Sequence, residues 1–138
     1  MFEDQKVQSW DYWDWWWPNT EEKISYTVLS VDKRVRFAGV VSEKGEVIEG
    51  GFQNEAGPLL DQHKEQQIYL DSLSAIDTLK EFSESLGDVM YNITEYKKVV
   101  LLTFPLKQGR ILCVSVCPGI DLMNVKNQVL KLLAERHP

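Results

Sequence analysis

The sequence is poor in the residues that build most catalytic and metal sites, with two cysteines and two histidines in 138 residues. Cys113 and Cys117 lie on a predicted strand, which would separate their Cα atoms by roughly 13 Å at about 3.3 Å per residue. A disulfide requires less than roughly 7 Å, and a tight metal site requires closer cysteines and further ligands. Both cysteines are therefore expected to be reduced residues of the core or of a sheet face.

The histidines and glycines show no catalytic pattern either. His63 falls in a polar helix start and His137 is the penultimate residue, so both are expected at the surface. The glycines of "GEVIEGGF" match neither a phosphate-binding loop nor a dinucleotide fingerprint, and no acidic pair has a distinctive spacing. We therefore predict a protein that is not an enzyme and has no cofactor and no metal. An enzyme that uses carboxylates or the two cysteines is the last alternative.

Positive charge and long apolar runs are also scarce. The 15 basic residues are outnumbered by 21 acidic ones, for a net charge of −6. This balance argues against nucleic acid and anionic lipid, which bind mainly through Lys and Arg. The longest apolar run, "VVLLTF", is far shorter than the roughly 18 residues of a membrane span. Because the N-terminus also lacks the pattern of a signal peptide, the expected location is the cytoplasm.

Hydrophobic periodicity and capping residues predict one domain with alternating helices and strands. Asn19 and Glu22 form a capping box before a short helix, and Asp61 and Asp121 are candidate caps of two further helices. The predicted order is a short helix, a hairpin over 34–52 around "EKGE", a long helix over 62–86, strands over 88–96, 99–106 and 110–116, and a last helix over 121–137. The run at 99–104 is predicted to be a central strand covered on both faces.

Alternation within the first strand predicts which side chains share a face. Val35, Phe37 and Val41 are expected on one face, and Ala38 and Val40 on the other. The apolar positions of the helix over 62–86 cover close to half of its circumference at about 100° per residue. So broad a stripe can contact a sheet on one side and another surface on its flank.

All five tryptophans are crowded near the N-terminus, in "SWDYWDWWWPNT". We consider three interpretations: the segment covers an apolar groove of its own domain, it binds between chains, or it lies at a membrane interface. Asp11 and Asp14 argue against an anionic bilayer, and a scar from an expression vector would remove any meaning. A helical projection spreads the rings over several faces, so two surfaces are needed to bury them. The predicted partner-binding residues are Trp10, Tyr12, Trp13, Trp15, Trp16 and Trp17.

Three stretches, "VLSVDKRVRFAGVVSEKGEVIEGGF", "LGDVMYNITEYKKVVLLTFPL" and "RILCVSV", together with the order of elements, resemble the roadblock and longin superfamily. The resemblance is closest to a group of uncharacterised archaeal proteins. It implies an α+β fold of profilin-like architecture, with a five-stranded antiparallel sheet and the order α-β-β-α-β-β-β-α. The chain would then divide into a Trp-rich segment at 1–18, a departure from the usual pattern, and a roadblock-like domain at 19–138.

The resemblance also implies a function. Roadblock-like proteins commonly pair through the long helix and the strand after it, and the paired domains dock partners, notably small GTPases. On this chain, the dimer interface would use Tyr69, Leu73, Ile76, Val89, Tyr91 and Ile93. We therefore predict a homodimeric scaffold or regulator, with a small GTPase as the candidate partner. The alternative is a small-molecule sensor of PAS or profilin-like architecture, although such sensors usually carry several short helices where this chain has one long helix.

Overall fold

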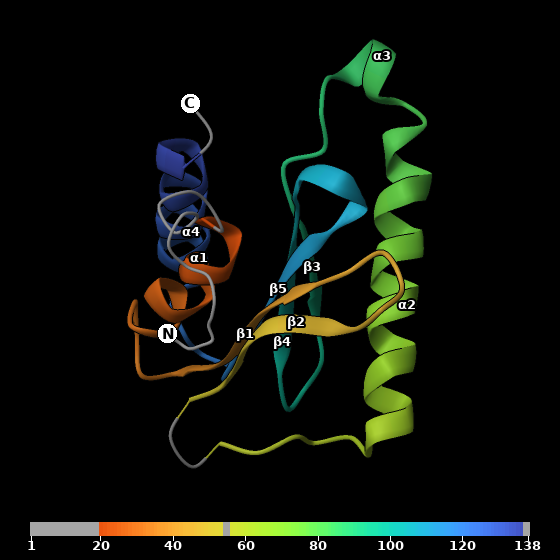
Figure 1. Cartoon of the computed structure of the whole chain (residues 1–138). Helices are drawn as coiled ribbons and strands as arrows, with labels where there is room; N and C mark the ends of the chain where they lie inside the picture. Colours follow the sequence, from red (N-terminus) through yellow and green to blue (C-terminus); the bar gives the residue numbers. More distant parts are fainter. Residues whose placement is uncertain (1–19, 54–55, 137–138) are drawn as a thin grey trace, which may run out of the picture.

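Five antiparallel strands form one sheet between two helical layers in the computed structural model, which describes residues 20–53 and 56–136 (Figure 1). The elements are α1 (Thr20–Leu29), β1 (Val35–Val41), β2 (Val47–Phe52), α2 (Gln62–Lys80), α3 (Ser83–Leu86), β3 (Asn92–Glu95), β4 (Val100–Pro105), the 3-10 turn η1 (Lys107–Gly109), β5 (Ile111–Val116) and α4 (Leu122–Arg136). The predicted fold class and order are confirmed, with α3 and η1 as short additions. The predicted cap Asn19 lies outside the described residues.

The strand order is β2-β1-β5-β4-β3, with β2 and β3 at the edges. The middle strand is β5, whose six residues are all buried. The continuous apolar run predicted to form the central strand lies instead in β4, between β5 and the edge strand β3. Leu101 and Pro105 of β4 are only partly buried, so this strand is not fully covered on both faces.

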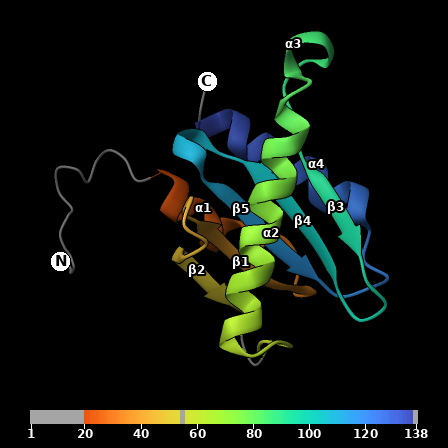
Figure 2. The same cartoon turned by 90° about the vertical axis from the view of Figure 1, so that its right-hand side faces the viewer.

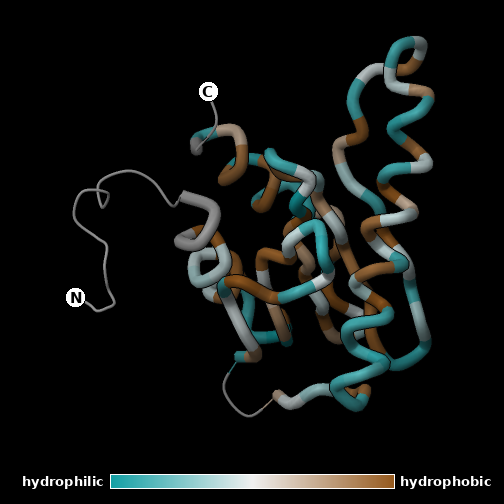
Figure 3. The backbone as a smooth tube through the Cα atoms, turned by 45° about the vertical axis from the view of Figure 1, so that its right-hand side comes forward, coloured by the Kyte–Doolittle hydropathy of each residue, from teal (hydrophilic) through white to brown (hydrophobic). Residues whose placement is uncertain are grey.

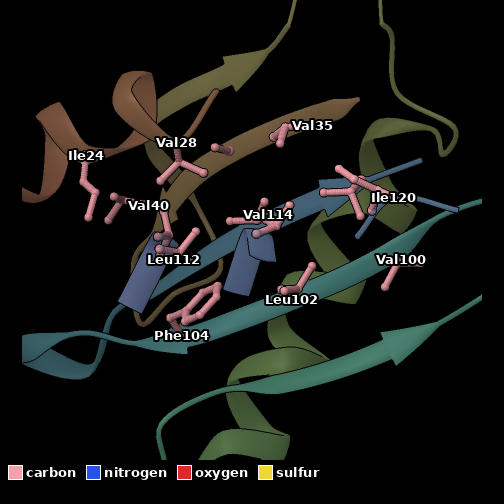
Figure 4. Close-up of a cluster of buried hydrophobic side chains, with 14 residues drawn as sticks. Ile24, Val28, Val35, Val40, Val100, Leu102, Phe104, Leu112, Val114 and Ile120 are labelled. Carbon is pink, nitrogen blue, oxygen red and sulfur yellow. The ribbon is translucent and has the colours of Figure 1, made fainter. Parts of the chain in front are cut away.

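One face of the sheet is covered by α1 and α4 (Figures 1 and 2). Ile24 and Val28 of α1 and Val125 and Val129 of α4 are at most 1% exposed. Figure 4 shows strand side chains meeting α1 in one apolar layer, and Figure 3 shows hydrophobic positions concentrated in the strands. We call this the closed face; its buried members from the strands and the loop before α4 are Val35, Ala38, Val40, Val100, Leu102, Phe104, Leu112, Val114, Val116 and Ile120. Each large side chain buried here contributes about 1.5–3 kcal/mol.

The opposite face is covered by α2 alone (Figure 2). Tyr69, Leu73 and Ile76 of α2 are buried in a smaller cluster whose strand members are Phe37, Val41, Ile111 and Cys113. The Phe37 ring lies 4.8 Å from the Phe52 ring and 6.1 Å from the Tyr69 ring, between centroids. These separations suit the offset arrangements that aromatic rings prefer. Part of the predicted apolar stripe of α2 therefore packs on the sheet of its own chain, whereas its C-terminal members Leu79, Phe82 and Leu86 are exposed.

Local signals in the sequence form the turns and caps they predict. The Asp61 carboxylate accepts a hydrogen bond from the Lys64 backbone N–H at 2.9 Å, which caps α2. The Asp121 carboxylate does the same for the Asn124 backbone N–H at 3.1 Å, before α4. Gly45 has a φ of +82° in the turn between β1 and β2, a conformation that favours glycine.

The long helix predicted over 62–86 ends earlier, at Lys80. The backbone N–H groups of Glu81 and Phe82 bond to the carbonyls of Thr78 and Leu79, three residues back, and tighten the last turn. Phe82 has φ −103° and ψ 8°, which breaks the helix before α3. The break follows from packing, because this end of α2 projects beyond the sheet (Figure 1) and helices rely on tertiary contacts for stability.

Two strand predictions are corrected. The strand expected over 88–96 is limited to β3, which pairs with β4 from Asn92 to Glu95. Two residues before β3, Met90 would face Pro105, which has no N–H to donate to a ladder. Val35 was expected on the face of Phe37 but belongs to the closed face. The register of β1 against β5 shifts between Val35 and Phe37, and this bulge inserts Arg36 and reverses the alternation.

Candidate functional site

The α2 side of the sheet is incompletely covered. In Figure 2, α2 crosses the sheet obliquely and leaves β3 and part of β4 open to one side. On this side β4 carries Leu101, which is partly buried, and Thr103, which is buried, and they pair with Ser115 and Cys113 of β5. We call these four residues the pocket floor. Two hydroxyls and a thiol stand here, where the closed face carries only Val, Leu and Phe on the same strands.

A pocket of about 550 Å³ lies over this floor. One wall is the inner side of α2, through Ile68, Tyr69 and Ser72. The Ser72 hydroxyl donates to the Ile68 carbonyl at 2.8 Å, so it is already satisfied within the helix. The other walls are Phe37 and Phe52 of β1 and β2, Leu59 and Leu60 before α2, and residues 96–99 between β3 and β4. The size is typical of sites that enclose a ligand or an anchoring side chain.

Basic side chains surround the pocket although the whole chain is acidic. Arg36, Lys97 and Lys98 line it, and Glu65 is the acidic residue among its lining residues. The Arg36 Nη2 donates to the Gly57 carbonyl at 2.8 Å, which holds the guanidinium near the pocket. Among the described residues, Lys97 and Lys98 form no ion pair. We call Arg36, Lys97 and Lys98 the basic rim.

Two buried titratable groups of the pocket, the Tyr69 hydroxyl and the Cys113 thiol, are neutral. Burial, and second the adjacent Glu65 carboxylate, raise the pKa of the Tyr69 hydroxyl far above its ordinary value. Burial raises the pKa of the Cys113 thiol to about 12. The pocket therefore has an uncharged floor with hydrogen-bonding groups, one carboxylate on the α2 wall and positive charge at its rim.

The two edge strands differ in how well they could accept another strand. β3 pairs with β4 in an unbroken register from Asn92 to Glu95. β2 is irregular, because its register with β1 shifts at Val40 and Val41 and Gly50 has a φ of +105°. Bulges protect sheet edges from adding strands. The regular β3 edge is therefore the better template for another chain.

An apolar arm projects from the end of α2 (Figure 1). It runs from Leu79 through α3 to Met90, and both of these residues are about half exposed, at 43% and 58%. Phe82 and Leu86 are more than half exposed, Leu86 at 82%. A cleft of about 620 Å³ separates the base of the arm from Leu130 and Leu133 of α4. So much exposed apolar area in one segment is typical of contact surfaces.

The predicted dimer-interface residues lie mostly inside the chain. Tyr69, Leu73 and Ile76 face the sheet of their own chain and are at most 9% exposed. Tyr91 and Ile93 pack on the closed-face core and Val89 packs under α2, all partly buried. The three α2 residues therefore cannot offer area to a second chain, although β3 can still pair through its backbone. The predicted partner-binding residues of the Trp-rich segment lie outside the described residues.

The pocket floor and the basic rim were not identified from the sequence. A signal was present, because Thr103, Cys113 and Ser115 occupy alternate positions among large apolar residues. Alternation of this kind marks one face of a strand as different from the other. In the described ranges 20–53 and 56–136, no group of three potential metal ligands occurs. No helix within these ranges is long and apolar enough to cross a bilayer.

Comparison with known proteins identifies the family. The chain belongs to DUF6659, a family of unknown function whose model matches residues 20–137. The match begins after the Trp-rich segment. No curated protein matches the chain significantly.

Several solved structures share the fold. The Roadblock/LC7 domain from Streptomyces avermitilis has a TM-score of 0.62 at 14% identity, covering 85% of this chain and 94% of that one. The gliding protein MglB from Thermus thermophilus has a TM-score of 0.64 at 13% identity, covering 85% and 87%. An MglB with a tetrameric arrangement has a TM-score of 0.63 at 14% identity, covering 82% and 84%. At these identities the similarity shows a roadblock-like fold, and function must be argued from the surface.

Proposed function

We propose that this member of DUF6659 is a non-enzymatic protein-protein interaction module. Two copies pair through β3 and the neighbouring side of α2, and the pair docks a protein partner. The observation that carries the proposal is a regular β3 edge, which pairs with no further strand within residues 20–53 and 56–136, beside an incompletely covered sheet face. An open edge next to apolar surface is the arrangement that β-strand addition uses.

The exposed residues of α2 and of the apolar arm support pairing at this side. Leu79 of α2 is 43% exposed, and Phe82 and Leu86 of the apolar arm continue the apolar surface. These three residues replace Tyr69, Leu73 and Ile76 as the proposed contribution of α2 and the arm to the interface. A pair related by a two-fold axis would bury the same surface on both copies.

The partner class comes from the roadblock resemblance, because proteins of that superfamily dock small GTPases. A small GTPase is therefore the proposed partner, with the chain as its scaffold or regulator. The solved MglB structure with a tetrameric arrangement supports assembly as a property of this fold. The measurement is calorimetric binding to a panel of small GTPases in the GTP and GDP states. We expect one nucleotide state to bind more tightly, and equal affinity in both states would contradict a regulatory role.

Light-scattering chromatography of two matched variants tests the pairing. Thr94→Lys places a long charged side chain on β3, where Thr94 is exposed. Ile48→Lys places the same side chain on the opposite edge strand β2, at a residue that is 38% exposed. Both variants are made in a chain with all five tryptophans changed to serine, so that contacts of the Trp-rich segment do not contribute. In this background we expect a dimer for Ile48→Lys and a mass close to the monomer for Thr94→Lys, and equal masses for the two variants would contradict pairing through β3.

The pocket favours a second candidate, the small-molecule sensor. Its volume of about 550 Å³ and its apolar walls would suit a small ligand. Against this candidate, the long helix α2 occupies the region where sensors usually place several short helices. Native mass spectrometry of the purified protein tests it, since a sensor is expected to carry a small molecule of constant mass and an interaction module is not.

A further inference from the structure

The pairing of β3 edges leaves the pocket unexplained. Edge pairing extends a sheet sideways, whereas the pocket opens over β4 and β5 beneath α2. Its lining combines three kinds of group: the aromatic rings of Phe37, Phe52 and Tyr69, the hydroxyls of Thr103 and Ser115, and the basic rim. The occupant that matches all three is an aromatic group with a hydrogen-bond donor and nearby negative charge.

Acidic tryptophan-rich sequence has this chemistry. An indole ring is flat and apolar and suits aromatic walls, and its N–H needs an acceptor when it is buried. The hydroxyl oxygens of Thr103 and Ser115 can accept that hydrogen bond. The cations of the rim can contact indole faces and neighbouring carboxylates.

The chain itself contains such a sequence. Residues 10–17 carry all five tryptophans together with Asp11 and Asp14. Residues 1–19 contain four acidic residues and one basic residue, which gives a net charge of −3. The pocket lining has three basic residues and one acidic residue, which gives a net charge of +2. The two surfaces are therefore complementary in charge as well as in apolar character.

We infer that residues 10–17 of a second copy of the chain dock in the pocket between α2 and the sheet. Large aromatic rings then cover the polar floor, and Asp11 and Asp14 face the basic rim. The exchange is reciprocal, because each copy supplies one segment and one pocket, so two copies form a closed pair.

The path of the chain favours a second copy over the same copy. α1 begins at Thr20 on the face of the sheet opposite α2 (Figures 1 and 2). Trp15 precedes Thr20 by five residues, which span at most about 18 Å even when extended. Packed layers lie about 10 Å apart, so a chain that leaves the α1 layer must pass the sheet and run round its edge to reach the α2 side. This detour uses most of the short extended length, which favours the pocket of a second copy for the tryptophans nearest α1.

Tryptophan fluorescence of the full chain tests the docking, because every tryptophan belongs to residues 10–17. The test variant is Lys97→Glu combined with Lys98→Glu, at two exposed positions of the rim. The matched control is Lys44→Glu combined with Lys131→Glu, two exposed lysines that do not line the pocket. We expect emission at short wavelength and protection from acrylamide in the wild type and the control. The rim variant should lose the protection and emit at longer wavelength.

Equal emission from the wild type and the rim variant would overturn docking in this pocket. Added salt gives a second readout, since screening should shift the wild type towards the emission of the rim variant. A small molecule found in the pocket by native mass spectrometry, with emission insensitive to the rim, would also overturn it.

Mixing two variants determines which copy supplies the segment. One partner is the rim variant, which keeps its tryptophans but has lost its own pocket. The other is a full-length chain with all five tryptophans changed to serine, which keeps its pocket but does not fluoresce at these wavelengths. Docking between copies predicts a shift to shorter wavelength on mixing, as the tryptophans enter the intact pockets. No change on mixing, together with protection in the wild type, would show docking within one chain and overturn the exchange.

Docking of the segment and pairing through β3 are independent, and their failures can be told apart. Exchanged segments could hold two copies together even when β3 is blocked. The masses of Thr94→Lys and Ile48→Lys are therefore compared in the chain without tryptophans. A difference there supports β3 pairing alone, whereas a rim-dependent emission in Thr94→Lys supports docking alone.

Discussion

The two faces of the sheet are built from the same strands but differ in their side chains and in how fully helices cover them. On the closed face, two helices cover an unbroken layer of Val, Leu, Ile and Phe side chains. On the α2 side, one helix covers the face incompletely and leaves a floor of Leu101, Thr103, Cys113 and Ser115 beneath a pocket. The closed face supplies the stability of the fold, and the incomplete face is free to bind another chain.

Adjacent leucines on β4 provide the sharpest test of this comparison. Leu102 is fully buried on the closed face, whereas Leu101 lines the pocket and is partly exposed. We expect Leu102→Ala to lower the free energy of unfolding by about 2–5 kcal/mol, because it leaves a cavity in a packed core. Leu101→Ala should cost about 1 kcal/mol or less, since its side chain buries less area. Urea unfolding of the two variants measures both, and equal losses would contradict the distinction between the faces.

The cap of α2 is the next largest effect, because α2 alone covers the open side. Asp61→Ala removes the acceptor for the Lys64 N–H and should cost about 1 kcal/mol. Asp61→Asn, which keeps an acceptor, is the matched control and should cost little. Thermal unfolding followed by circular dichroism measures both. A loss as large for the control as for Asp61→Ala would show that the cap bond is not the cause.

The smallest effect tests whether the pocket floor is shielded from water. Burial raises the pKa of the Cys113 thiol from 9.0 to about 12, so the folded chain holds this proton more tightly than the unfolded chain. The stabilisation is complete below pH 9 and is lost as the pH rises towards 12. The free energy of unfolding should therefore fall by about 1 kcal/mol between pH 8 and pH 10 because of this thiol.

Cysteine variants isolate this contribution. Unfolding by urea at pH 8 and pH 10 should show the extra loss in the wild type and in Cys117→Ala, since Cys117 is only partly buried. Cys113→Ala should lack it. A pH dependence unchanged in Cys113→Ala would mean that water reaches the floor and that the thiol ionises as freely as in the unfolded chain.

Much of the fold followed from local signals in the sequence. Asp61, Asp121 and Gly45 act where their residue types predict, because caps and turns depend on a few neighbouring residues. The face of Val35 was predicted wrongly, because a bulge depends on the pairing of β1 with a distant strand. The end of α2 was also missed, since it depends on where the sheet stops.

The candidate site was less predictable for a different reason. The apolar stripe of Tyr69, Leu73 and Ile76 was assigned to a dimer interface, but it packs on the sheet of its own chain. Periodicity shows that a helix face is buried and does not show which chain buries it. The pocket joins Arg36 and Lys97 from segments far apart in the sequence, and no local pattern records that they meet.

Hydrogen-deuterium exchange of the full chain tests the central claim most directly, by comparing the two edge strands. If a second copy pairs with β3, the backbone amides of Asn92–Glu95 are protected in concentrated protein and lose protection on dilution. The amides of the irregular edge β2, Val47–Phe52, exchange at the same rate at both concentrations. Exchange of β3 that is fast and independent of concentration would show that no second copy pairs with β3.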